Sequence, residues 1–155
     1  MFTPLITFSA SILIWFLFLG LLILWVIDGK IKREAVLHAL LAVVSVWLLT
    51  LVTKSLFQTE RPFLFNQKDT LTITIPADNS FPSTHTAVAF ALATTIYLHD
   101  RKNGLVFFWG AFLVAMGRIL ANVHYPFDTI IGAFLGVLVA WGVGKTHLFG
   151  ILKGR

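Results

Sequence analysis

Six of the charged and histidine side chains of this sequence are candidates for binding an anion and transferring a proton. They are two histidines, one carboxylate and three cations, namely Lys54, Arg61, His85, Arg118, His124 and Asp128. Arginine binds phosphate oxygens as a bidentate fork, and several cations together neutralise a phosphate and the charge of its transition state. A histidine held by a carboxylate can act as a nucleophile, and a second histidine can protonate a leaving oxygen. The set favours phosphoryl transfer, and without a carboxylate cluster for Mg²⁺ or Ca²⁺ we expect no metal or other cofactor.

The rest of the chain has the composition of a membrane protein. Of its 155 residues, 57% are hydrophobic and 12% are charged, against roughly 25% charged residues in ordinary soluble domains. A soluble core of this size could not bury so much apolar surface. The net charge of +5 is spread over short loops between apolar runs, so we expect no nucleic-acid binding. The chain has no cysteine, which excludes disulfides and thiolate metal sites.

Five apolar runs have lengths near the roughly 17–25 residues that cross a bilayer. They cover residues 2–27, 35–57, 84–98, 104–122 and 129–144. The first run has no basic residue before it and is too long for a signal peptide. The predicted fold class is therefore an all-α integral membrane bundle of about five transmembrane helices, in a single domain over residues 1–155. The polar stretch 58–82 contains three prolines, and its alternating residues 70–75 predict a short extended segment.

The basic residues predict an orientation in the cell membrane. Five spans place the two termini on opposite sides, and Lys and Arg are more numerous on the side of the C-terminus. Because basic residues mark the cytoplasmic side, we expect the N-terminus outside, the C-terminus in the cytoplasm, and the 58–82 loop on the extracytoplasmic face. Four basic residues break this bias and need a separate reason: Lys54, Arg61, Lys68 and Arg118.

The alternating topology brings the six chemical side chains to one membrane surface. Lys54 and Arg61 are seven residues apart, so we expect both on one face of the second span, which Pro62 ends after Arg61. His85 falls in the first turn of the third span, where free backbone N–H groups suit an anion. Asp128 has a position typical of the N-cap of the fifth span.

Two further patterns have structural interpretations. Gly132-x3-Gly136 is expected to pack helices within the bundle. His38, His99 and His147 fall at or near the predicted cytoplasmic ends of spans, and we expect them to be interfacial.

Three spaced motifs occur in order: Lys54-x6-Arg61-Pro62, Pro82-Ser83-Thr84-His85, and Gly117-Arg118-x5-His124-x3-Asp128. They resemble the pattern of the type 2 phosphatidic acid phosphatase superfamily, K-x6-R-P, P-S-G-H and S-R-x5-H-x3-D. The motif-bearing core, residues 54–128, is about half of the chain. Thr84 replaces the usual Gly, and Gly117 replaces a Ser whose hydroxyl assists phosphate binding. The superfamily usually has six spans, and the missing span would be N-terminal.

The resemblance implies a role for each residue. His124 attacks phosphorus and forms a phosphohistidine, and Asp128 orients His124. His85 protonates the leaving group and then activates water. The phosphate is held by Lys54, Arg61, Ser83, Thr84 and Arg118.

The expected substrate is a phosphorylated lipid in the bilayer. Undecaprenyl pyrophosphate is the first choice, and phosphatidylglycerophosphate, phosphatidic acid and lipid A 1-phosphate are close alternatives, because the motifs bind phosphate and do not read the tail. A non-catalytic lipid or anion transporter could use the same cations, but it has no use for the His124–Asp128 pair. A heme or metal protein with His85 and His124 as ligands is disfavoured by the adjacent cations. No oligomeric state is predicted.

Overall fold

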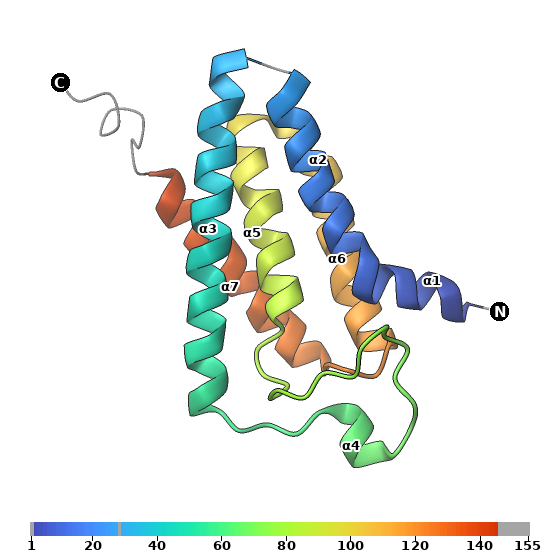
Figure 1. The fold of residues 1–155 in the computed structure, drawn as a ribbon. Helices are drawn as coiled ribbons and strands as arrows, with labels where there is room; N and C mark the ends of the chain where they lie inside the picture. Colours follow the sequence, from blue (N-terminus) through green and yellow to red (C-terminus); the bar gives the residue numbers. More distant parts are fainter. Residues whose placement is uncertain (1, 28, 146–155) are drawn as a thin grey trace.

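The chain folds as a bundle of helices in the computed structural model, which describes residues 2–27 and 29–145, without the side chains of residues 29–33 (Figure 1). The elements are α1 (Thr3–Thr7), the π-helical turn η1 (Phe8–Ile12), α2 (Leu13–Ile27), α3 (Gly29–Leu56), α4 (Pro62–Asn66), α5 (Thr84–His99), α6 (Arg101–Leu120) and α7 (Pro126–Gly144). The first three form one interrupted helix, and η1 lies where α1 turns away from the axis of α2 (Figure 1). The predicted all-α class is confirmed.

Four helical segments are long and apolar enough to cross a membrane: Thr3–Ile27, Glu34–Leu56, Arg101–Leu120 and Pro126–Gly144. The fifth predicted span, α5, has 16 residues, or about 24 Å of helix against a hydrocarbon core of roughly 30 Å. It lies in the middle of the bundle and packs against α2, α3, α6 and α7 (Figure 1). Because protein surrounds α5, this helix does not need the full length of a lipid-exposed span.

Small residues let the neighbouring helices approach α5 closely. A Cβ atom added to Gly136 of α7 would lie 2.3 Å from the carbonyl oxygen of Ala87, and one added to Gly132 would lie 2.6 Å from the carbonyl oxygen of Ser83. On α6, a Cβ atom at Gly104 would lie 2.2 Å from the Cα atom of Tyr97. The prediction that Gly132-x3-Gly136 packs helices within the bundle is confirmed.

The outer surface of the bundle is apolar. Large exposed side chains occur on every long helix, on α5 at Leu98 near its end, and they include Trp15, Trp25, Trp47, Trp109, Phe112, Phe134 and Trp141. Lipid is the solvent that suits such a surface, because it removes these side chains from water.

The region after α3 differs from the sequence prediction. Helix α3 ends at Leu56, so Lys54 and Arg61 do not share a helical face. Arg61 is instead the N-cap of α4, with φ −80° and ψ 152°. Pro62 causes this, because a proline disfavours the α region for the residue before it and is well suited to the first position of a helix.

The segment between α4 and α5 forms a loop that contacts the turn after α6. Residues 70–75, predicted as extended, contain bends and no ladder. The Leu71 N–H donates instead to the Ala121 carbonyl at 3.1 Å. The Asn66 and Asn122 side chains exchange two hydrogen bonds of 2.8 and 3.0 Å. These contacts hold the loop against the end of the bundle that contains the α6–α7 turn (Figure 1).

The first prediction compares two glycines of α7. Gly136→Ala is expected to lower the midpoint of thermal unfolding in detergent, because the new methyl group overlaps the Ala87 carbonyl, and overpacking costs about 1–3 kcal/mol. Gly142→Ala is the matched control, since no atom lies within 4 Å of its added Cβ. The control should be neutral or slightly stabilising, because alanine favours a helix over glycine. Equal midpoints for the two variants would contradict the close α5–α7 contact.

Candidate active site

The predicted site residues gather at one end of the bundle, where α3 ends and α5 begins, which we call the site end (Figure 1). Each comes from a different element or turn: Lys54 from the last turn of α3, Arg61 from the N-cap of α4, His85 from the first turn of α5, Arg118 from the last turn of α6, His124 from the α6–α7 turn, and Asp128 from the first turn of α7. All except His85 are at most 5% exposed. So much buried charge requires specific partners.

His124 and Asp128 form an oriented pair. Oδ2 of Asp128 lies 3.5 Å from Nδ1 of His124 and accepts a hydrogen bond of 2.5 Å from the Ser80 hydroxyl. Nε2 of His124 faces the other way and lies 3.3 Å from Nη1 of Arg61. Oγ of Ser80 also lies 3.5 Å from Nδ1. The tautomer with its proton on Nδ1 suits these two oxygens and leaves the lone pair on Nε2, which lies among the cations.

Asp128 is also part of the start of α7, although not as its N-cap. Tyr125 is the N-cap and Pro126 the first helical residue, so the predicted position of Asp128 is wrong by three residues. The Asp128 carboxylate accepts the Tyr125 N–H at 2.9 Å, as the third residue of a capping box does. Proline at the first position favours this arrangement, because its missing N–H needs no partner there.

The environment of His124 keeps its imidazole neutral. Burial lowers the pKa of His124 to about 4; the charges of Arg118, Arg61 and Lys54 also lower this pKa, while the hydrogen bond to Asp128 opposes them. A neutral imidazole, which keeps a lone pair on one nitrogen, is the form that acts as a nucleophile.

Lys54 and Arg61 share a partner in the loop before α5. Oδ2 of Asp78 lies 3.1 Å from Nζ of Lys54, and Oδ1 of Asp78 lies 2.6 Å from Nη2 of Arg61. Lys54 also donates to the Asn79 carbonyl, and Nε of Arg61 donates to the Asp78 carbonyl at 2.8 Å. Burial raises the pKa of Asp78, but the charges and hydrogen bonds of Lys54 and Arg61 outweigh this effect and hold the pKa below its usual value.

Arg118 is held by the N-terminal segment. Its Nη1 donates to the Ala10 carbonyl at 3.1 Å, whereas its Nε is buried without a partner among the described residues. Gly117 lets η1 come this close, because a Cβ atom there would lie 2.5 Å from Oγ of Ser9 and 2.7 Å from the Ala10 nitrogen. This contact accounts for glycine at a position where the superfamily usually has serine.

The start of α5 completes the site. Ser83 is the N-cap, and its own N–H donates to the Asp128 carbonyl at 3.1 Å. The first-turn N–H groups, which include those of Thr84 and His85, have no intrahelical partners and suit an anion. His85 lies close enough to Arg118 and His124 to interact with them electrostatically.

The structure therefore brings the predicted residues together and adds two that sequence reasoning missed, Ser80 and Asp78. Both lie in the polar loop before α5. Serine and aspartate are common in such loops, so their presence there does not indicate a functional residue. In the described part of the chain, no three His, Cys, Asp or Glu side chains are grouped as metal ligands.

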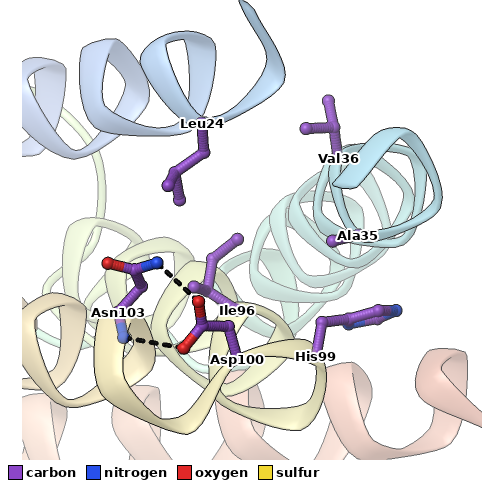
Figure 2. Close-up of a pocket in the computed structure, with 7 residues that line it drawn as sticks. All are labelled: Leu24, Ala35, Val36, Ile96, His99, Asp100 and Asn103. Atoms are coloured by element: carbon purple, nitrogen blue, oxygen red, sulfur yellow. Dashed lines mark hydrogen bonds between the residues drawn. The ribbon is translucent and has the colours of Figure 1, made fainter. Parts of the chain in front are cut away.

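A separate cavity of about 230 Å³ lies at the opposite end of the bundle (Figure 2). It is lined by Leu24, Ala35, Val36, Ile96, His99, Asp100 and Asn103. Nearby, Nδ1 of His38 lies 3.2 Å from Nε2 of His99. His38 is buried against protein near the start of the Glu34–Leu56 segment, and its interfacial position stays a prediction. His147 lies outside the described residues. None of the predicted site residues lines this cavity.

A helical membrane bundle with an oriented histidine among buried cations has the architecture of a membrane phosphatase. Residues 35–149 match the family model described as the PAP2 superfamily. The chain belongs to this superfamily, as its motifs predicted, and it is a phosphatase by enzyme class.

Relatives and a solved structure support this assignment. The chain is 36% identical over 140 residues to the "Bacitracin transport permease protein BcrC" of Bacillus licheniformis, covering 90% of this chain and 69% of that protein. It is 27% identical over 121 residues to the "Undecaprenyl-diphosphatase BcrC" of Bacillus subtilis, covering 78% of this chain and 62% of that protein. The crystal structure of Aquifex aeolicus LpxE superposes with a TM-score of 0.75 at 28% identity, covering 94% of this chain and 84% of that one.

The second prediction concerns Ser80. Ser80→Ala is expected to lower kcat for phosphate release about tenfold with little change in KM, because a hydrogen bond to a charged group contributes about 1.5–3 kcal/mol. Ser55→Ala, at an exposed hydroxyl of α3, is the control and should change neither constant. The loss should vanish in an Asp128→Asn background, since Ser80 acts through Asp128. An equal loss in both backgrounds would show that Ser80 does not position this carboxylate.

Proposed function

We propose that this protein is a metal-independent phosphatase of membrane lipids that acts on undecaprenyl pyrophosphate through a phosphohistidine. The observation that carries the proposal is the orientation of His124, whose Nδ1 faces Asp128 while Nε2 faces the cations. The proposal treats residues 1–155 as one domain with 54–128 as its motif-bearing core.

In the first step, the lone pair on Nε2 of His124 forms a bond to the terminal phosphorus. The bond from this phosphorus to the bridging oxygen breaks, and its electron pair goes to that oxygen. His85 takes up a proton when the anionic substrate binds beside it. It donates this proton to the oxygen, and undecaprenyl phosphate leaves. Asp128 stabilises the positive charge that develops on the His124 ring.

In the second step, water gives a proton to His85 and attacks the phosphohistidine. The P–N bond breaks, its electron pair returns to Nε2, and inorganic phosphate is released. The charge on the transferring group is neutralised in both steps by Lys54, Arg61, Arg118 and the first-turn N–H groups after Ser83, including that of Thr84.

An aromatic groove beside the nucleophile suits the lipid tail. It has a volume of about 430 Å³ and is lined by Phe57, Thr59, Phe81, Tyr125, Phe127 and Asp128. The Phe81 ring is 5.7 Å from that of Phe127, in a stacked pair, and 5.6 Å from that of Phe57. Because Asp128 belongs to both the groove and the reaction centre, we propose that the isoprenoid units next to the phosphate lie in this groove. Phosphatidylglycerophosphate, phosphatidic acid and lipid A 1-phosphate are the alternative substrates.

We propose that the site end faces the extracytoplasmic side, with the N-terminus outside and the C-terminus in the cytoplasm. Basic residues in loops mark the cytoplasmic side, so exposed basic residues at the site end would conflict with this orientation. Lys54, Arg61 and Arg118 are instead buried among partners in the site, which is the separate reason that they require.

A transporter is the second candidate, because the relative from Bacillus licheniformis has a transport permease name. The same cations would bind the phosphate of a transported lipid or anion. Such a protein would move labelled phosphate without releasing it, and it would not depend on His124 as a nucleophile.

The third prediction tests the reaction. In detergent with EDTA, the wild type is expected to release phosphate from undecaprenyl pyrophosphate, and His124→Gln is expected to reduce the rate at least about 1,000-fold because the nucleophile is lost. His38→Gln, a buried histidine at the opposite end, is the control and should retain activity. Wild-type rates in the folded His124→Gln variant would exclude the phosphohistidine and favour the transporter.

The fourth prediction tests the groove. Phe127→Ala is expected to raise KM for undecaprenyl pyrophosphate several-fold and to leave hydrolysis of water-soluble p-nitrophenyl phosphate unchanged, because it removes apolar surface for the tail only. Phe134→Ala is matched to it, as an exposed phenylalanine of the same helix outside the groove. If both variants have the same KM for the lipid, the tail does not lie against Phe127.

A further inference from the structure

Every N–H donor of Arg61 is already engaged by the protein. A guanidinium has five such donors. Nε donates to the Asp78 carbonyl at 2.8 Å, Nη1 contacts the Val123 carbonyl at 2.7 Å and Nε2 of His124 at 3.3 Å, and Nη2 contacts Oδ1 of Asp78 at 2.6 Å and the Asn79 carbonyl at 3.3 Å. Arg61 therefore cannot form a bidentate pair with phosphate until it releases part of this set.

The contact that phosphate can best replace is the Asp78 carboxylate. It places one oxygen on Arg61 and the other on Lys54, as two oxygens of a bound phosphate would. The Asp78 side chain is 55% exposed, whereas those of Lys54 and Arg61 are 6% and 3% exposed. The carboxylate thus lies at the boundary with solvent and covers two buried cations.

We propose that Asp78 is an internal competitor for phosphate, which occupies the Lys54–Arg61 cation pair in the resting enzyme and is displaced when a phosphate group binds. This inference rests on the proposed function of the site. Asp78 belongs to none of the three motifs, and the inference assigns to it control over the affinity for phosphate.

The surrounding structure gives Asp78 room to move. A cavity of about 330 Å³ borders the Asp78–Asn79 segment and is shared with α4, through Phe63 and Leu64. The segment is fixed immediately after this point, where the Ser80 N–H donates to the Thr59 carbonyl at 2.9 Å. Displacement of Asp78 therefore does not require Ser80 to leave the Asp128 carboxylate.

Such a competitor has a use in a phosphatase of lipids. Inorganic phosphate, the product, binds to the same cations as the substrate, and without competition it would remain bound. A lipid substrate compensates for displacing Asp78 through contacts between its tail and the aromatic groove, whereas free phosphate has no tail. Competition by Asp78 therefore favours release of the product and disfavours water-soluble phosphates.

The fifth prediction is that Asp78→Asn binds inorganic phosphate about tenfold more tightly than the wild type, because the amide keeps the size of the side chain but not its charge. The measurement is isothermal titration calorimetry of the full chain in detergent. Asp69→Asn is the matched control, as an exposed acid of the same loop, and should bind phosphate like the wild type. Unchanged or weaker binding by Asp78→Asn would overturn the proposal and leave Asp78 as a residue that merely holds Lys54 and Arg61 in place.

A second measurement, of thermal unfolding, tests the proposal even if Asp78→Asn is less stable than the wild type. Asp78→Asn is expected to unfold at a lower temperature without phosphate, since two buried cations lose their shared anion, and phosphate should raise its midpoint more than that of the wild type. A lower midpoint with an equal or smaller phosphate effect would overturn the proposal. Failure of the proposed function would be seen separately, as an absence of lipid hydrolysis by the wild type, because phosphate binding is measured without turnover.

Discussion

Burial of positive charge is the constraint on which the site end of this protein depends. Lys54, Arg61 and Arg118 are each at most 5% exposed, and an uncompensated charge in such a place is strongly destabilising. The compensation comes from three segments that are distant in sequence. The loop before α5 supplies Asp78 and two carbonyl groups, the α6–α7 turn supplies the Val123 carbonyl, and η1 supplies the Ala10 carbonyl.

Close helix packing makes this arrangement possible. Gly132 and Gly136 bring α7 against α5, and the resulting contact between the Ser83 N–H and the Asp128 carbonyl places the start of α5 beside the His124–Asp128 pair. Gly117 likewise lets η1 pack closely against α6, beside Arg118. Small residues on helices that look purely structural thus determine where the partial positive charge of a helix start and a guanidinium are placed.

The sequence predicted the parts of this structure that follow from local pattern or from motif spacing. Hydropathy identified the five long helices, and alternation of spans brought distant motif residues to one end. The prediction was wrong where a local signal had two meanings, since Pro62 begins a short helix instead of ending a long one. It was silent where the contact is between segments distant in sequence, as for Asp78 with Lys54 or Ala10 with Arg118, because neither residue has a type or spacing that indicates its partner.

The two aspartates of the site show how environment separates one role from another. Asp128 is 4% exposed and receives hydrogen bonds from the Ser80 hydroxyl and the Tyr125 N–H, both independent of any phosphate. Asp78 is largely exposed, and its carboxylate is held by two cations that a phosphate would also engage. A carboxylate fixed by neutral donors of the fold stays in place when the substrate arrives, so Asp128 can orient a nucleophile through the reaction. A carboxylate that is bound only by cations can be exchanged for a substrate phosphate that binds to the same cations. This difference suits Asp78 to competition and Asp128 to positioning.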